Sequence, residues 1–291
     1  MHNFLSAIGF SKLNKVTEID MMIQNTIDSY DDKLVVEDEM GRLICQMSKG
    51  CGDDMGVSVC GEYDEENRFY RDQYFPYFRG ASVSAQAEVT FERQIGRETY
   101  VAAYEDPRVG VTIIFFLQNM GEYLNMVSRG EYSRAPLTVQ LAGLAREGSI
   151  LFPIKKNKVT DEERKENTNY RNHLINAARN GDEDAMESLT MEDIDTYSMI
   201  SKRIETEDVL TIVDTYFIPY GLECDQYHIL GDILNVDLIK NQVTGEEVYQ
   251  MELLCNDIQL DVCINKENLF GEPEVGRRFK GIIWLQGYVN L

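Results

Sequence analysis

Short runs of apolar residues, broken by polar turn residues, dominate the first half of the chain. After one helix predicted from Thr17 to Ile27, these runs are rich in Val, Ile, Tyr and Phe, and Gly, Asp, Asn and Pro separate them, as is typical of strands. Strands are predicted over Lys33–Glu37, Arg42–Met47, Val57–Tyr63, Arg68–Phe75, Ala85–Arg93, Thr99–Tyr104 and Val109–Leu117. The last run is apolar almost throughout, so we expect it to be a central strand covered on both faces. Hairpin turns are expected at Asp38–Gly41 and Asp64–Asn67, and a short helix at Met120–Val127.

In the middle of the chain the apolar residues change to helical spacing. Residues Thr160–Glu163 read Thr-Asp-Glu-Glu, a capping box that predicts the start of a helix. That helix is expected to stop at Asn180-Gly181. Two more helices are predicted, over Asp182–Leu189 and from Met191 to about Arg203. The polar stretch Lys155–Thr160 that precedes them is the predicted boundary.

The last part of the chain returns to a strand pattern. Strands are predicted over Tyr227–Val236, Glu247–Leu254, Ile258–Ile264 and Arg278–Tyr288. Short strands at this spacing are typical of a small barrel and resemble an OB-fold. The predicted fold class is therefore α+β, with an N-terminal mixed or antiparallel sheet carrying helices, a helical middle segment and a small C-terminal β-barrel. The predicted domains are residues 1–154, 155–225 and 226–291.

Charge narrows the range of partners. Lys and Arg number 28 against 50 Asp and Glu, which gives a formal net charge of −22. Such a chain repels polyanions, so neither duplex nucleic acid nor a membrane is an expected partner. The N-terminus has no cationic start and only a short apolar run, and the six cysteines form no Cys-x-x-Cys pair. These features predict a cytoplasmic protein with reduced, mostly buried thiols.

One acidic stretch resembles a calcium-binding loop but lacks two essential positions. Asn180, Asp182 and Asp184 have the right spacing. Position six is Ala185 and position twelve is Met191, where a calcium loop needs a Gly to turn and a bidentate Glu to close the shell. We therefore expect helix capping and solvent-exposed carboxylates there.

Motifs for a nucleotide cofactor or a transition metal are also incomplete. The glycines of Gly50–Gly56 are spaced one residue too far apart for a dinucleotide fingerprint, and a strand follows where a helix is required. Cys224 and His228 are separated by three residues, but that stretch reads as extended, whereas a metal pair at this spacing needs a helix. The sequence therefore predicts no metal and no cofactor.

Tyrosines and carboxylates are densest where the helical segment meets the predicted barrel. The candidate ligand-binding residues there are Asp195, Tyr197, Asp214, Tyr216, Tyr220 and Asp225. Such residues line clefts for polar ligands, and they also suit a domain junction, because a phenol packs its ring and still satisfies its hydroxyl. Within the barrel, Arg277, Arg278 and Trp284 are the basic and aromatic set. They could hold an anion or stack a base, or an arginine could brace a carboxylate.

Three stretches carry a family resemblance. They are Met1–Lys12 (MHNFLSAIGFSK), Asn180–Ser198 (NGDEDAMESLTMEDIDTYS) and Gly271–Gly287 (GEPEVGRRFKGIIWLQG). The chain resembles, over its full length, a family of clostridial proteins classed as a domain of unknown function. The resemblance implies a cytoplasmic protein of anaerobic Firmicutes, and it implies no activity, ligand or catalytic residue.

The sequence therefore leaves three functional hypotheses. The first is a non-catalytic binding or regulatory protein for a small polar ligand or a protein partner, including a second copy of the chain. The alternative is a carboxylate-dependent hydrolase near the junction of helical segment and barrel, with Asp195, Asp214 and Asp225 as candidates. The third is a binder of single-stranded nucleic acid, which requires a continuous positive groove with exposed aromatic side chains.

Overall fold

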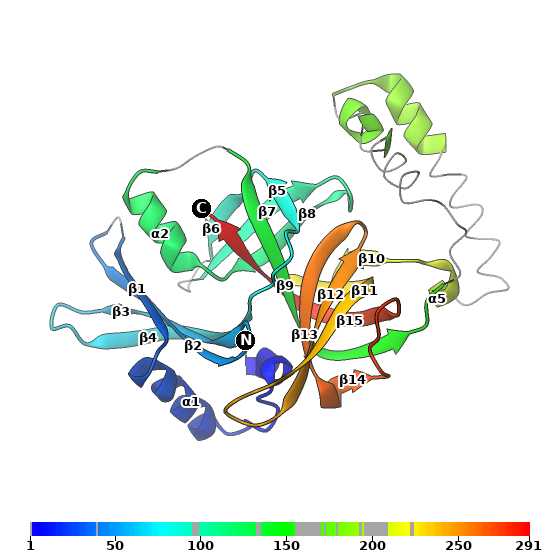
Figure 1. The fold of residues 1–291 in the computed structure, drawn as a ribbon. Coiled ribbons are helices and arrows are strands. Elements are labelled where there is room, and N and C mark those ends of the chain that lie inside the picture. Colours follow the sequence, from blue (N-terminus) through cyan, green and yellow to red (C-terminus); the bar gives the residue numbers. More distant parts are fainter. Residues whose placement is uncertain are drawn as a thin grey trace.

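The computed structural model describes residues 2–38, 40–94, 99–131, 135–154, 170–171, 173–178, 180–191, 194, 209–221 and 224–291. The predicted boundary at Lys155–Thr160, the helix start at Thr160 and most of the helix expected over Met191–Arg203 lie outside these residues. Helical residues at 173–178 and 183–191 confirm part of the helical middle segment. In Figure 1 they lie at the upper right, apart from the two sheets.

The first sheet is a four-stranded antiparallel meander. Its strands, in spatial and sequence order, are β1 (Asp32–Glu37), β2 (Leu43–Gly52), β3 (Met55–Tyr63) and β4 (Phe69–Phe78). Both predicted hairpin turns are confirmed. Asp38 and Asp64 each accept backbone hydrogen bonds across the turn, and the positive φ angles that the turns need fall on Gly41 and Asn67.

The second sheet has eleven strands and joins segments that are far apart in the sequence. Its main order is β10-β11-β12-β13-β9-β15-β8-β7-β6, and β5 and β14 also pair with β9. Its strands are β5 (Ala85–Ala87), β6 (Thr90–Arg93), β7 (Tyr100–Asp106), β8 (Val111–Leu117), β9 (Leu137–Leu151), β10 (Tyr216–Pro219), β11 (Gln226–Lys240), β12 (Glu247–Cys255), β13 (Ile258–Asn265), β14 (Leu269–Phe270) and β15 (Arg278–Asn290). The protein is therefore α+β, with most of its regular structure in sheets.

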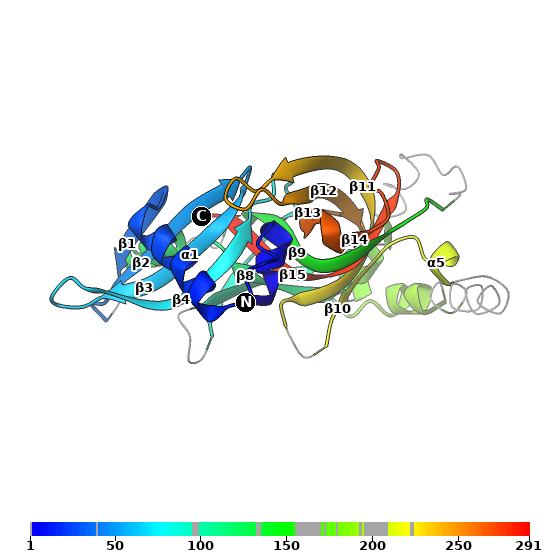
Figure 2. The same ribbon diagram turned by 90° about the horizontal axis from the view of Figure 1, so that it is seen from below.

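Five of these strands pair in a ring. β11 pairs with β12 and also with β15, so the pairing runs β11-β12-β13-β9-β15 and returns to β11. The β13–β9 pair is parallel, and the other four pairs are antiparallel. Figure 2 shows these strands curving around one another. β9 and β15 come from segments predicted as separate domains. The division at residues 154 and 226 stays a prediction, and the sheet is continuous across it.

Side chains on the two faces of the ring strands enter different hydrophobic cores. Tyr227, Ile229 and Ile283 belong to the core that β11, β12, β13, β9 and β15 share. Leu144 and Trp284 point to the other face of the same strands, into a second core that includes residues of the first sheet. Because successive strand residues face opposite ways, each ring strand presents one inner and one outer face.

Helices cover parts of the sheets. The helix predicted from Thr17 is confirmed as α1 (Val16–Asp28), and the one predicted at Met120–Val127 is confirmed as α2 (Met120–Ser128). Three further helical elements are η1 (His2–Ile8), α5 (Val209–Ile212) and η2 (Lys266–Asn268). η1 packs against β9, β13 and β4, and thus between the sheets.

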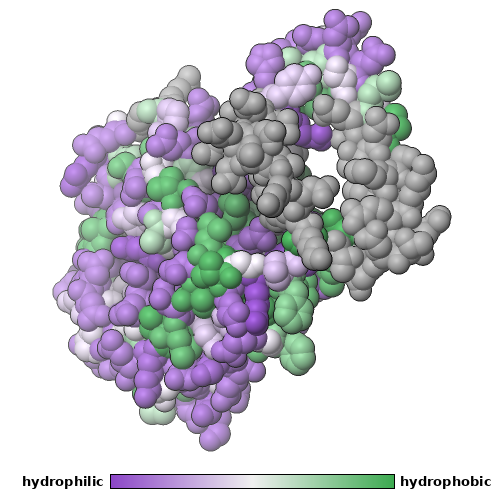
Figure 3. Space-filling model, turned by 45° about the vertical axis from the view of Figure 1, so that its right-hand side comes forward, coloured by the Kyte–Doolittle hydropathy of each residue, from purple (hydrophilic) through white to green (hydrophobic). Residues whose placement is uncertain are grey.

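The face of the molecule shown in Figure 3 is largely hydrophilic. On this face (Figure 3), apolar surface forms patches among larger hydrophilic areas.

The six cysteines are free thiols, and five of them are buried. Among the described residues, every helix is too short or too polar to reach across a bilayer.

Candidate functional site

The predicted site residues do not form one cluster. Asp195 and Tyr197 lie outside the described residues. Arg278 is the first residue of β15 and Arg277 directly precedes it, whereas Trp284 lies six residues beyond Arg278 along the strand. At about 3.3 Å per residue, this separation is roughly 20 Å. The structure therefore does not combine the two arginines with the tryptophan in one site.

Arg278 is buried and binds the backbone. Its guanidinium donates hydrogen bonds to the carbonyl oxygens of Leu210 at 2.8 Å, Val213 at 3.0 Å and Phe152 at 3.1 Å, with a longer contact to that of Asp214 at 3.3 Å. Burial lowers the pKa of Arg278, although nearby carboxylates partly offset that effect. Arg278 thus ties β15 to two other segments and has little capacity left for a ligand.

Arg277 has a local carboxylate partner. Its guanidinium lies 2.8 Å from a carboxylate oxygen of Glu274 and donates to the carbonyl oxygen of Glu272 at 2.8 Å. It also stacks over the ring of Phe152, with its central carbon 5.6 Å from the ring centroid. Of the alternatives left open by the sequence, these contacts match an arginine that braces a carboxylate.

Trp284 and Asp225 are brought together. The indole N–H of Trp284 donates to a carboxylate oxygen of Asp225 at 2.7 Å. The indole is buried, and its ring centroid lies 5.0 Å from that of Phe116 and 5.4 Å from that of Phe4 in η1. Asp225 therefore satisfies a buried donor beneath η1, and it does not line the groove described next.

Phe4 of η1 packs against Trp284 on the outer face of β9 and β15. Next to this contact, the strand pairing is irregular. The pairs Ile283–Ala145 and Gly281–Gly148 leave two β9 residues, Arg146 and Glu147, opposite the single residue Ile282 of β15. This is a β-bulge, which changes the direction of side chains on the bulged strand. Arg146 and Glu147 are both exposed and both line the same cavity.

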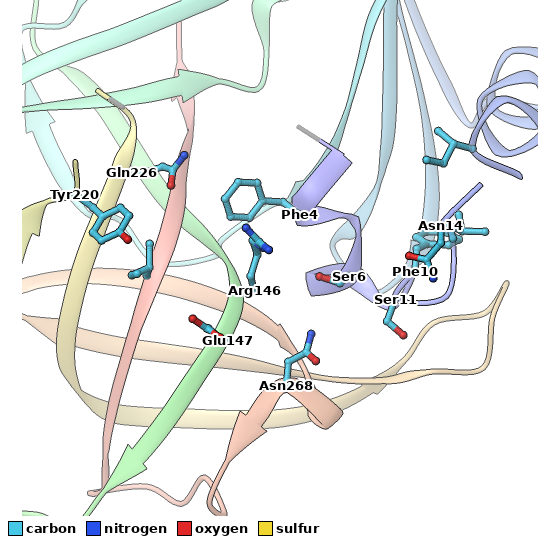
Figure 4. A pocket seen from close by; sticks show the side chains of 13 residues that line it. Phe4, Ser6, Phe10, Ser11, Asn14, Arg146, Glu147, Tyr220, Gln226 and Asn268 are labelled. Carbon is cyan, nitrogen blue, oxygen red and sulfur yellow. The ribbon is translucent and has the colours of Figure 1, made fainter. Parts of the chain in front are cut away.

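Two adjoining cavities open on this face. The larger has a volume of about 600 Å³ and the smaller about 360 Å³, and they share Glu147, Asn268 and Ile282. We call the two cavities together the outer groove. The other groove residues used below are Phe4, Arg146, Tyr220, Gln226, His228, Phe270 and Lys280. Figure 4 shows the larger cavity, with Arg146 beside Phe4 and in the space between Tyr220 and η1.

β11 and β15 supply the floor of the outer groove. Their antiparallel register places His228 opposite Ile282, and Gln226 opposite Trp284. The imidazole Nε2 of His228 lies 3.1 Å from the hydroxyl of Tyr216, which comes from the edge strand β10. Burial lowers the pKa of His228, and the positive charge of Lys280 lowers it further.

Arg146 and Lys280 are the unusual groups of the outer groove. Among the described residues, neither side chain makes a hydrogen bond or an ion pair. Elsewhere in the structure, cations such as Arg42, Arg68 and Arg108 bind carboxylates at 2.6–2.8 Å. Glu147 brings one negative charge to the same groove, so these two unpaired cations still give it a positive balance, in a chain with a net charge of −22, and are available to bind an anion.

Aromatic side chains flank these cations. Tyr220 is 45% exposed and lines the larger cavity, and Phe270 is 80% exposed and lines the smaller one. An exposed ring next to an arginine offers a flat apolar surface against which a ligand can stack. Of the predicted site residues that the structure describes, Tyr220 alone lines the outer groove.

Three groove residues, Arg146, Lys280 and His228, were not among the predicted site residues. Arg146 and Lys280 come from strands more than 130 positions apart in the sequence, and no local motif links them. One signal in the sequence could have identified Lys280: side chains alternate along a strand, so Lys280 and the predicted site residue Trp284, four residues apart on β15, lie on the same face. For the hydrolase alternative, Asp214 is exposed and, like Asp225, does not line the groove.

A model of one protein family, described as "Domain of unknown function, E. rectale Gene description (DUF3881)", matches residues 5–287. Comparisons with curated proteins and with solved structures gave no match. Among the described residues, no group of three or more His, Cys, Asp or Glu side chains is placed to hold a metal ion.

Proposed function

The chain belongs to the DUF3881 family, and because that membership brings no activity with it, we propose from the geometry that the protein is a non-catalytic binding protein whose outer groove takes a small anionic ligand. The observation that carries this proposal is the pair of uncompensated cations, Arg146 and Lys280, in one groove of an acidic protein. This proposal keeps the small polar ligand of the sequence analysis and moves its site from the tyrosine- and carboxylate-rich junction to the outer face of β9, β15 and β11.

The ligand's anionic group would bind Arg146. A guanidinium presents several N–H donors in one plane and matches carboxylate and phosphate oxygens in pairs. Lys280 adds a second positive charge from the adjoining cavity. Glu147 lines both cavities and opposes excess negative charge, which favours a ligand with one compact anionic group over a polyanion.

The rest of the ligand would lie against the aromatic side chains. Tyr220 and Phe270 offer ring faces, and Gln226 and Asn268 offer amide donors and acceptors. The volumes of about 600 and 360 Å³ lie within the range of small-molecule sites. The ligand class that fits is therefore a small molecule combining a phosphate or carboxylate with a flat ring.

The outer groove is built on paired strands, which suits a binding role. We propose that the ring β11-β12-β13-β9-β15 is a small barrel with OB-like architecture, on the strength of the pairing that returns to β11. Sites on paired strands hold their side chains more precisely than sites on loops. We also propose a cytoplasmic location, because the six free thiols suit a reducing compartment.

Trp284 is the single tryptophan of the chain and lies next to the outer groove, which allows a direct test. We expect adenosine monophosphate to change the tryptophan emission in a saturable way, and adenosine, which lacks the anionic group, to have little effect. Arg146→Gln and Lys280→Gln should each weaken binding about tenfold or more, the value of one charge-assisted hydrogen bond.

Lys240→Gln is the matched control, because it removes the same charge from the far end of β11. It should bind adenosine monophosphate like the parent protein. The proposal is overturned if the nucleotide gives no saturable change, if adenosine binds as tightly, or if Arg146→Gln binds like the parent.

A further inference from the structure

Another cavity, of about 310 Å³, lies between the first sheet and the start of α2. It shares no lining residue with the outer groove. We call it the inter-sheet pocket, and the residues that matter here are Asp32, Asp54, Tyr77, Arg79 and Glu122, together with the hydroxyls of Ser48 and Ser58. Both signs of charge therefore face one small pocket.

Arg79 provides the positive side of the inter-sheet pocket. The central carbon of its guanidinium lies 4.4 Å from the ring centroid of Tyr288, a cation–π contact. Among the described residues, its side chain has no carboxylate within ion-pair distance. Its backbone N–H donates to the carbonyl oxygen of Asp54 at 2.7 Å, which fixes the chain at this point. The guanidinium is thus positioned by a ring and keeps its hydrogen-bond donors.

Three carboxylates provide the negative side. Asp32 and Asp54 line the inter-sheet pocket, and their side chains make no hydrogen bond among the described residues. Glu122 accepts from the hydroxyl of Tyr288 at 2.8 Å and from the side-chain amide of Asn119 at 2.9 Å. Tyr288 therefore holds Arg79 on its ring face and Glu122 at its hydroxyl, which keeps the two charges apart.

Hydroxyl groups complete the lining. The hydroxyl oxygens of Ser48 and Ser58 are 2.7 Å apart and form a hydrogen bond. Burial raises the pKa of Tyr77 to about 12, so its hydroxyl remains a protonated donor at neutral pH. Gly56 is required at this position, because a Cβ there would lie 2.6 Å from the Tyr77 hydroxyl. The residues around the inter-sheet pocket thus fix donors and acceptors in place.

We propose that the inter-sheet pocket binds a free α-amino acid, with the ligand's carboxylate on Arg79 and its ammonium group on Asp32 and Asp54. Opposite charges that face one cavity without pairing with each other are complementary to a ligand that carries both signs. Three carboxylates repel a purely anionic ligand, and a purely cationic one would leave Arg79 without a partner. A volume of about 310 Å³ is at the lower limit of small-molecule sites, which suits a ligand as small as an amino acid.

The test begins with thermal shift and isothermal titration calorimetry of the full chain against the twenty free L-amino acids. At least one should raise the unfolding midpoint and give a saturable heat. The N-acetylated form of that amino acid lacks the ammonium group, and its amide lacks the carboxylate. Both blocked forms should bind at least about tenfold more weakly, because each loses one charge-assisted contact.

Variants then locate the site. Arg79→Gln and Asp32→Asn should each weaken binding of the best amino acid about tenfold or more. Arg71→Gln is the matched control, because Arg71 lies on β4, the strand that Arg79 directly follows, and pairs with Asp20 outside the pocket. It should bind like the parent, and so should Arg146→Gln, which reports on the outer groove alone. A failure of this proposal is therefore distinguishable from a failure of the proposed function.

Three results would overturn the proposal. The first is that none of the twenty amino acids binds. The second is that a blocked form binds as tightly as the free amino acid, which would show a ligand of one charge sign. The third is that Arg79→Gln and Asp32→Asn, folded as judged by circular dichroism, bind like the parent protein.

Discussion

Cationic side chains have different partners in the first sheet and on strand β15. In the hairpins of the first sheet, Arg42 and Arg68 each pair with an aspartate four residues earlier, at 2.7 and 2.8 Å. On β15, Arg278 is buried against backbone carbonyls, and Lys280 has neither a hydrogen bond nor an ion pair from its side chain among the described residues.

This difference relates the partner of a cationic side chain to its role in the protein. A cation that pairs with a near neighbour in sequence is neutralised where it stands, and it mainly supports the local turn. On β15 the two cations have no such neighbour: Arg278 satisfies buried carbonyls, and Lys280 remains available to a ligand. The predictions below test that distinction, beginning with the largest expected effect.

Arg278→Met should destabilise the protein strongly. The variant keeps the length of the side chain but leaves the carbonyl oxygens of Phe152, Leu210 and Val213 without their donor. We expect the free energy of unfolding to fall by about 3 kcal/mol or more, measured by urea denaturation. A loss under about 1 kcal/mol would mean that Arg278 contributes no more to the free energy of unfolding than an arginine of the hairpin turns.

Lys280→Glu should leave the fold intact and impair the outer groove. Reversing the charge replaces an attraction for an anion with a repulsion. We expect affinity for adenosine monophosphate to fall by about 10- to 100-fold in the Trp284 fluorescence titration, with little change in the urea midpoint. If the affinity for adenosine monophosphate is unchanged, Lys280 does not contribute to ligand binding.

His228 should make stability depend on pH. Burial and the charge of Lys280 hold its pKa below the usual 6.5 in the folded protein. The unfolded chain therefore binds more protons as the pH falls below 6.5, and stability should decrease towards the pKa of the folded state. The loss should be under about 1 kcal/mol, because water screens a partly exposed group. Lys280→Gln should reduce this dependence and His228→Gln should remove it; an identical pH profile in His228→Gln would contradict the assignment.

Arg68→Gln should have the smallest effect. The side chain is 64% exposed, and its partners Asp64 and Glu66 belong to the same turn. We expect a loss of under about 1 kcal/mol in urea denaturation and unchanged ligand binding. A loss as large as that of Arg278→Met would remove the difference between the two regions.

Local patterns predicted much of the fold. The turns at Asp38 and Asp64, the helices α1 and α2 and the buried strand β8 all follow from residues close together in sequence. The segment predicted as Ala85–Arg93 proved to be two short strands, β5 and β6, with different partners. An uninterrupted alternation of apolar and polar residues does not reveal where the chain changes its pairing partner.

β9 has no counterpart among the predicted strands, although it is central to the second sheet. Its sequence is rich in small residues, and Gly and Ala have low strand propensity. These residues are needed because larger neighbours fill the space: a Cβ at Gly143 would lie 2.8 Å from the side chain of Ile283, and one at Gly148 would meet the ring of Phe279. Only the packing of β15 on β9 explains the choice.

By itself the sequence determined the family, the strand-rich α+β class, the hairpin turns and the excess of negative charge, because each depends on composition or on residues near one another. The tertiary structure alone decided which charges remain uncompensated. The bulge that places Arg146 and Glu147 opposite Ile282 exists only when β9 pairs with β15. That register brings together side chains more than 130 residues apart, and no local pattern encodes it.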